Sequence, residues 1–198
     1  MEQAPSFSRR AVTKMEVVAL VWVLGLAAYC LVPAVVRSRI EANRAACLSN
    51  LTSIGKALSS YMENNDGRWP FVAKLRSVRV GDQSRWSTLP AVLSKELSAD
   101  SPVYHCPADA RRNSSGGSTP GLKGNYYSTE GLSYEWWWGE ARGGRRIGEE
   151  SISKASGFGF GRADQRVLSD FEPFHDGDGG GAINSLYADF VARSSRGG

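Results

Sequence analysis

The sequence is poor in the residue types from which metal centres and activated nucleophiles are built. It contains two histidines and three cysteines among 198 residues. No CxxC or HExxH segment occurs, so no zinc-binding pattern is present. The segments GxxxxGKS/T and GxSxG are also missing, which argues against a nucleotide-driven motor and against a hydrolase nucleophile elbow. The sequence therefore predicts neither an enzyme nor a resident cofactor.

The overall composition is that of a globular protein. Hydrophobic residues make up 41% and charged residues 22% of the chain, and its length fits one domain of ordinary size plus a tail or an anchor. The net charge is +4, from 24 basic and 20 acidic residues, and this excess is too small to indicate a nucleic-acid partner. The 22 glycines are concentrated late in the sequence and predict a loop-rich second half.

One long apolar run lies near the N-terminus. Val17 to Val36 contains no charged residue, and a helix of this length spans roughly 30 Å, the apolar thickness of a bilayer. A membrane helix is therefore the first interpretation. The alternatives are a buried core helix, a plain signal anchor, a secretory signal cleaved near Val32-Pro33-Ala34, and a lipoprotein signal at Cys30.

Glu16 lies at the edge of this run, where a carboxylate is costly in lipid unless it has a partner. If the chain is cut between Ala11 and Val12, Glu16 of one copy can pair with the new α-amino group of a neighbouring copy. This pairing offsets the cost of the charge and sets the register between subunits. The alternative is an interfacial carboxylate that reaches water without a partner. Gly25 and Pro33 are costly in soluble helices but are tolerated in membrane helices.

These positions together match a family pattern. Counted from Val12, Thr13 is the second residue, Glu16 the fifth, Gly25 the fourteenth and Pro33 the twenty-second. The segment resembles the N-terminus of type IV prepilins and type II secretion pseudopilins, in which a basic leader and a small residue precede the cleavage point.

The resemblance has three departures: Ala11 stands where Gly is usual, Val12 where Phe is usual, and Lys14 where an apolar residue is usual. It implies a leader at residues 1–11, which prepilin peptidase removes on the cytoplasmic side before the new amine is methylated. It also implies a single-pass protein of the bacterial inner membrane with a periplasmic C-terminal domain. The implied partners are further copies of the chain, other pseudopilins, prepilin peptidase and the inner-membrane secretion platform.

Helical periodicity continues beyond the apolar run. We expect residues 12–36 to form the membrane or filament-core half of one helix and residues 37–66 an amphipathic continuation that packs on a globular domain. Asn64 to Gly67 is typical of a helix end, and a helix continuous from Thr13 to Met62 is roughly 75 Å long. The apolar stripe of the second half consists of Ile40, Cys47, Leu51, Ile54, Leu58 and Tyr61.

Residues 67–198 are expected to form the extracytoplasmic domain. A short helix is expected within Ser87–Leu97, and loops at residues 113–124 and 139–148. The predicted fold class is α+β and pilin-like, with a long N-terminal helix packed on a small antiparallel sheet with long loops. β-Favouring residues between glycine- and proline-rich breaks predict the strands, at Val103–Cys106, Tyr126–Ser128, Ser133–Trp138, Arg166–Phe171 and Ala182–Val191.

Short motifs in the second half give a further resemblance. They are Cys47-Leu48-Ser49-Asn50-Leu51, Asn65-Asp66-Gly67, Tyr104-His105-Cys106-Pro107 with Asp109, Ser133-Tyr134-Glu135-Trp136, and Asp170 with Phe174-His175. Together they are similar to a pseudopilin-like family whose chains often end with a His, nine residues and Asp-Gly. Here thirteen residues separate His175 from Asp189, and Phe190 replaces the Gly.

The cysteines allow one internal bridge. Cys47 and Cys106 are candidates for a disulfide if the domain lies outside the cytoplasm. Such a bridge would tie the long helix to the domain and close a loop of about 59 residues. Two small buried thiols are the alternative. Cys30 lies inside the apolar run and is expected only to pack there.

One cluster of acidic residues lies on a glycine-rich segment. Hard oxygen ligands in such a loop suit calcium, and Asp176-Gly177-Asp178-Gly179 begins like an EF-hand loop. The later ligands of such a loop are missing, because Tyr187 stands at the twelfth position counted from Asp176, where the bidentate Glu belongs. A solvated turn is the alternative to a calcium site. The cluster consists of Asp170, His175, Asp176, Asp178 and Asp189.

Aromatic and basic clusters keep a second class of function open. Tyr134 and the tryptophans at 136–138 could stack on a glycan or a partner, with alternate members filling the core. The arginines within 142–146 could contact DNA phosphates, with a solvated loop as the alternative. The main hypothesis is a structural subunit of a type II secretion pseudopilus or type IV pilus-like filament. The alternative is a membrane-anchored extracytoplasmic module that binds DNA or glycan.

Overall fold

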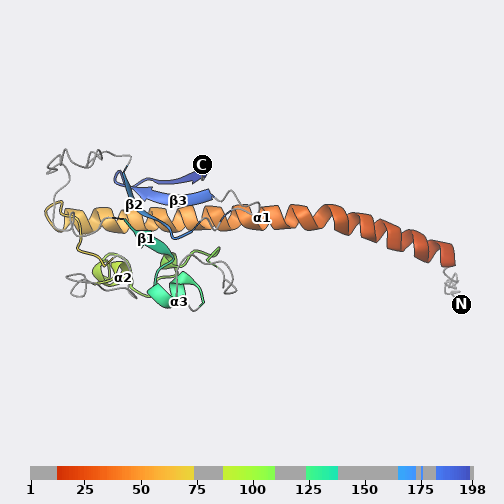
Figure 1. Ribbon diagram of the computed structural model, residues 1–198, viewed down its shortest axis with the longest axis horizontal. Coiled ribbons are helices and arrows are strands. Elements are labelled where there is room, and N and C mark those ends of the chain that lie inside the picture. Colours follow the sequence, from red (N-terminus) through yellow and green to blue (C-terminus); the bar gives the residue numbers. More distant parts are fainter. Residues whose placement is uncertain are drawn as a thin grey trace, which may run out of the picture. The chain divides into compact units, whose positions relative to one another are not determined.

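The computed structural model describes residues 13–73, 87–109, 124–137, 165–172, 175 and 182–196. The chain divides into two units, residues 1–39 and residues 40–198. One helix, α1 (Lys14–Glu63), contributes residues to both units, so the boundary between them falls inside this helix (Figure 1). The prediction of a single long helix with two different halves is confirmed.

The end of α1 is set by backbone conformation. Asp66 and Gly67 adopt positive φ angles of 56° and 72°, the left-handed conformation that commonly ends helices. The Gly67 N–H donates a hydrogen bond to the Met62 carbonyl at 2.7 Å, which satisfies one of the last carbonyls of the helix. The stop predicted at residues 64–67 is therefore confirmed.

The described strands of the second unit form an antiparallel sheet. Its spatial order is β1-β2-β3-β4, so each strand pairs with the next one along the chain. This arrangement confirms the predicted α+β class. The strands are β1 (Tyr134–Trp136), β2 (Arg166–Asp170), β3 (Ala182–Tyr187) and β4 (Ala192–Arg196).

The strand predicted over Ala182–Val191 is confirmed for Ala182–Tyr187, but a turn occupies the rest of this segment. Tyr187 donates its N–H to the Val191 carbonyl at 3.1 Å, and Phe190 takes a positive φ of 60°. Phe190 therefore occupies the left-handed position that glycine adopts most easily. No strand was predicted at β4, because Ala192–Arg196 reads ARSSR and contains no β-branched or aromatic residue.

The strands predicted at Val103–Cys106 and Tyr126–Ser128 are also wrong, because local capping produces helical turns there. Ser101 and Pro102 begin the 3₁₀ turn η2 (Pro102–Tyr104), where the Ser101 hydroxyl accepts the Val103 N–H. The Asn125 side chain accepts the Ser128 N–H and starts α3 (Tyr126–Glu130). Capping residues of this kind outweigh β propensity over three or four residues. The helix expected within Ser87–Leu97 is present but short, as α2 (Leu89–Val92).

The hydrophobic core lies in the second unit. The predicted apolar stripe of α1 supplies its helical side, except that Ile40 and Tyr61 are only partly buried. All seven buried residues of α1 lie between Cys47 and Met62. Gly55 permits close packing, because a Cβ at this position would lie 2.9 Å from Leu186 Cδ1 and 3.0 Å from the Phe190 carbonyl oxygen. The fully buried larger side chains of the cluster include Leu51, Ile54, Leu58, Tyr104, Tyr134, Trp136, Leu168 and Leu186.

Candidate functional site

The first half of α1 presents an apolar surface that the chain itself does not cover. Every residue from Thr13 to Arg39 is exposed, including Trp22 at 70% and Tyr29 at 81% of their surface. Leaving a large aliphatic or aromatic side chain in water forgoes about 1.5–3 kcal/mol relative to burying it. Among the described residues, α1 is the one helix long and apolar enough to cross a membrane. The first half of α1 is therefore a candidate membrane span.

Glu16 lies in the first turn of this helix, where Thr13 and Glu16 cap each other. The Thr13 N–H donates to Glu16 Oε2 at 2.8 Å, and the Glu16 N–H donates to Thr13 Oγ1 at 3.3 Å. This reciprocal pair is the capping box, which satisfies two of the free donors at a helix start. Our sequence interpretation missed it, although the Thr-x-x-Glu spacing is its signature. Thr13 and Glu16, two of the residues in the predicted pattern, thus also have a local role.

The other residues of the predicted assembly and processing pattern have different outcomes. Gly25 has no heavy atom within 4 Å of the position that a Cβ would occupy, so its packing within the described chain does not require glycine. Pro33 lies inside α1 without ending the helix. Ala11 and Val12, the predicted cleavage pair, lie outside the described residues.

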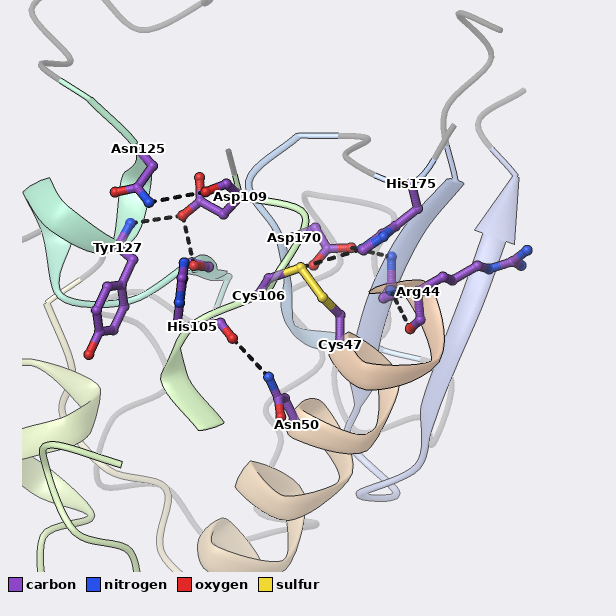
Figure 2. The surroundings of a disulfide bond; sticks show 12 residues. Arg44, Cys47, Asn50, His105, Cys106, Asp109, Asn125, Tyr127, Asp170 and His175 are labelled. Atoms are coloured by element: carbon purple, nitrogen blue, oxygen red, sulfur yellow. Dashed lines mark hydrogen bonds and ion pairs between the residues drawn. A yellow bond between two sulfur atoms is a disulfide. The ribbon is translucent and has the colours of Figure 1, made fainter. Parts of the chain in front are cut away.

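A disulfide joins the second half of α1 to the domain. Of the two alternatives for Cys47 and Cys106, the structure contains the bridge, across 59 positions of sequence. Both residues are fully buried. One turn further along α1, Asn50 Nδ2 donates to the His105 carbonyl at 2.9 Å (Figure 2). The helix is therefore fastened to the segment around Cys106 by a covalent bond and a hydrogen bond.

An Asp–His pair lies directly beside the disulfide (Figure 2). His175 Nε2 lies 3.6 Å from Cys106 Sγ and 3.2 Å from Asp170 Oδ2. The side chains of Asp170 and His175 have no exposed surface. The Asn184 N–H donates to Asp170 Oδ2 at 2.7 Å. Burial raises the pKa of the Asp170 carboxyl, while the hydrogen bonds from His175 and Asn184 act in the opposite direction.

A second buried carboxylate, Asp109, organises the turn that leads into β1. It accepts the N–H groups of Tyr126 and Tyr127 at 3.1 and 2.9 Å, and the Ser133 hydroxyl at 2.7 Å. Three donors on one carboxylate satisfy its buried oxygens, and two of them are free donors at the start of α3. Asp109 therefore has a structural role that its position in the Tyr104–Asp109 motif did not reveal.

The acidic cluster considered for calcium is divided between separate partners. Asp170 pairs with His175, as described above, and Asp189 forms an ion pair with Arg193, with Arg193 Nη1 3.2 Å from Asp189 Oδ1. The Asp189 carboxylate also accepts the Val191 N–H in the β3–β4 turn. Asp176 and Asp178 lie outside the described residues. The described members of the cluster thus already have protein partners.

The tryptophan cluster is divided between the core and the surface, as predicted. Trp136 is 1% exposed, whereas Trp137 is 47% exposed. The Arg166 guanidinium lies 5.2 Å from the centre of the Trp137 ring, and Trp137 Nε1 donates to the Ser169 hydroxyl. Trp138 and the arginines within 142–146 lie outside the described residues.

Comparison of the chain with protein-family models, with curated proteins and with solved structures finds no match.

Proposed function

We propose that the chain is a structural subunit of a type IV pilin-like filament, most specifically a type II secretion pseudopilus. The observation that carries this proposal is the division of α1 into an uncovered apolar half and a half that belongs to a folded core. The residues from Val17 to Val36 expose their side chains throughout. The residues from Cys47 to Met62 supply one side of the domain core.

An apolar helix of this kind suits two environments that a filament subunit meets in turn. Before assembly, lipid covers it, because its length matches a bilayer. After assembly, equivalent helices of neighbouring copies cover it, because side chains exposed in one copy bury each other in a bundle. The domain core packs against the other half of the helix, so replacing lipid by neighbouring helices around the apolar half leaves the core intact.

Glu16 gives this model its specific chemistry. The capping box occupies Oε2 with one hydrogen bond from Thr13, but it does not neutralise the carboxylate. In a lipid or bundle environment the remaining charge needs a cation. In our proposal, prepilin peptidase cuts between Ala11 and Val12, and the new α-amino group of a neighbouring copy supplies that cation. The pairing fixes the axial position of each subunit.

The disulfide supports a location outside the cytoplasm for the domain. Structural disulfides persist in oxidising compartments and are rare in the reducing cytosol. The bridge between Cys47 and Cys106 closes 59 positions of sequence, so an oxidising compartment benefits the fold directly. We accordingly place the protein in the bacterial inner membrane with a single span and a periplasmic domain.

The test of this proposal is incorporation into filaments. Glu16→Ala removes the carboxylate and should lower incorporation while the protein stays in the membrane fraction, because the apolar run is unchanged. Incorporation is measured as the share of protein in sheared filaments relative to membranes. Glu63→Ala serves as the control, because it removes an exposed carboxylate of the same helix outside the apolar half. Wild-type incorporation of Glu16→Ala would contradict the proposal.

A further inference from the structure

The polar environment of the disulfide is unusual for a purely structural bridge. His175 Nε2 lies 3.6 Å from Cys106 Sγ, and Asp170 Oδ2 lies 3.2 Å from the same nitrogen (Figure 2). Burying an imidazole and a carboxylate is costly, and apolar residues of similar volume usually stabilise a core at least as well. The S–S bond itself needs neither group. The position of the pair therefore points to a role in the chemistry of the sulfur.

The geometry defines what each group offers to Cys106. With a hydrogen on Nε2, His175 can donate toward both Asp170 and Cys106 Sγ. A thiolate at Cys106, present whenever the bridge is open, would accept this hydrogen. Burial opposes ionisation of the thiol, and a donor in contact with the sulfur offsets that effect. Cys47 Sγ lies within 4.8 Å of both Cys106 Sγ and a ring nitrogen of His175. The hydrogen-bond contact of the imidazole, however, is with Cys106.

Asp170 is itself held in place from two elements. The Asn184 N–H of β3 donates to Oδ2 at 2.7 Å, and Asn184 Nδ2 lies 3.5 Å from the Arg44 carbonyl of α1. The other titratable groups that act on this region are Asp109, which raises the pKa of Asp170, and Tyr134, on which both carboxylates act. The imidazole is thus the donor in contact with the sulfur, and Asp170 orients it.

We propose that His175 is a catalytic residue for thiol–disulfide exchange at Cys106, with Asp170 as its positioning residue and a small or protein disulfide as the oxidising co-substrate. The proposal stands on the geometry of the disulfide region and is independent of filament assembly.

The exchange proceeds in two displacements. The Cys106 thiol releases its proton to water, and the thiolate, stabilised by the His175 N–H, attacks one sulfur of the donor disulfide. One donor thiolate leaves, and a mixed disulfide forms on Cys106. The deprotonated Cys47 then attacks Cys106 Sγ, forms the Cys47–Cys106 bond and releases the second donor thiolate. Two protein thiols lose two electrons and two protons, and the donor disulfide becomes two thiols.

His175 and Asp170 have the same roles in the reverse reaction, the opening of the bridge. An attacking thiolate reaches Cys47 Sγ, and Cys106 leaves as the thiolate that His175 stabilises. A leaving thiol of lower pKa departs faster, so the imidazole accelerates both directions. Cys47, Cys106 and the His175 side chain are fully buried, so an external thiol or disulfide reaches the sulfurs only when this part of the core opens locally.

The test uses the full chain in detergent, in a Cys30→Ser background, so that Cys47 and Cys106 are its remaining thiols. The protein is reduced, the reductant is removed, and closure by oxidised glutathione is followed across pH 5.5–9. His175→Leu, which has no hydrogen-bond donor, should slow closure near pH 7 by roughly tenfold and alter the pH profile, because the variant lacks the N–H that stabilises the thiolate. His105→Leu, the same change at the other histidine, should close at the wild-type rate, because the His105 side chain stacks on Tyr127.

A second measurement does not depend on the folding of the His175 variant. With Cys47→Ser, the mixed disulfide on Cys106 should form several-fold faster than the mixed disulfide on Cys47 in Cys106→Ser. Equal rates for the two cysteines, or a faster Cys47, would overturn the proposal. So would closure of a folded His175→Leu variant at the wild-type rate with the wild-type pH profile. Asp170→Asn should fall between wild type and His175→Leu.

Discussion

Thr13 and Glu16 hold each other at the start of α1 through two hydrogen bonds, from the Thr13 N–H to Glu16 Oε2 and from the Glu16 N–H to Thr13 Oγ1. Glu16 therefore has a function within its own chain, in addition to the proposed pairing with a neighbouring copy. A glutamine at position 16 keeps the cap, because the amide oxygen accepts the same hydrogen bond. It removes only the charge, so the two roles can be separated.

We predict that Glu16→Gln lowers filament incorporation almost as strongly as Glu16→Ala, because the neighbouring amine loses its counter-charge in both variants. Thr13→Ala keeps the charge and loses the hydroxyl acceptor, which costs the helix start about 1 kcal/mol. It should retain most of the wild-type incorporation. The measurement is the ratio of filament to membrane protein for the three variants. If Glu16→Gln assembles as wild type, the role of Glu16 is confined to the capping box.

We predict that the packing of α1 against β3 and the β3–β4 turn depends on the lack of a side chain at Gly55. An added Cβ would meet Leu186 Cδ1 at 2.9 Å and the Phe190 carbonyl oxygen at 3.0 Å. The leucine side chain can rotate, but the carbonyl belongs to the tight β3–β4 turn and cannot move independently. Gly55→Ala should therefore lower the free energy of unfolding by about 1–3 kcal/mol, measured by urea unfolding in detergent. Gly25→Ala is the matched control and should leave the domain transition unchanged; equal transitions for both variants would contradict the packing argument.

Reduction of the Cys47–Cys106 bridge should destabilise the domain without altering the first half of α1. A loop of this length is worth about 4 kcal/mol in the chain-entropy model, and measured losses are usually about 2–5 kcal/mol. The urea midpoint of the full chain should fall accordingly after reduction. Cys30→Ser should leave the midpoint unchanged, because Cys30 is exposed and unbridged. An unchanged midpoint after complete reduction would show that the hydrophobic cluster alone fastens the helix.

Tyr104 should make the domain sensitive to alkaline pH. Burial, followed by the charge of Glu96, raises the pKa of Tyr104 to about 12. This value lies above the ordinary value of 10.0, so the folded domain favours the neutral phenol. The contribution of Tyr104 to the free energy of unfolding is therefore fully present below about pH 10 and is lost as the pH rises toward 12. Tyr104→Phe should reduce this alkaline loss.

At neutral pH, the free energy of unfolding of Tyr104→Phe should lie within about 1 kcal/mol of the wild-type value, or above it. The reason is that no described group bonds the buried Tyr104 hydroxyl. The measurement is the urea midpoint at pH 7 and at pH 10.5, in a Cys30→Ser background. An alkaline loss as large as that of wild type would show that another group titrates.

The features predictable from sequence are those that depend on neighbouring residues. The uncharged run from Val17 to Val36, the apolar stripe and the Asn-Asn-Asp-Gly stop are local patterns, and they gave α1 nearly residue by residue. The strands around Tyr134 and Val167 were found for the same reason. The wrong strand at Tyr126–Ser128 has a non-local cause besides the local Asn125 cap, since Asp109 accepts two further hydrogen bonds at the start of α3.

The disulfide region could be predicted only in part. Cys47 and Cys106 were a candidate pair because few cysteines exist to choose from. The contact between His175 and Cys106 joins residues 69 positions apart, and the Asp170 contact depends on the course of the chain after β2. No spacing rule encodes either contact. The Thr13–Glu16 capping box, in contrast, was readable from its four-residue spacing and was overlooked because the family pattern explained the same residues.

Assembly through a processed N-terminal helix is best tested by the intact mass of the protein extracted from membranes with and without prepilin peptidase. We expect the peptidase to produce a chain that begins at Val12 and carries one added methyl group. A chain that remains uncut with the peptidase present would contradict the account and would favour an anchored binding domain. A chain that begins near Val35 would identify a secreted protein and exclude the filament model.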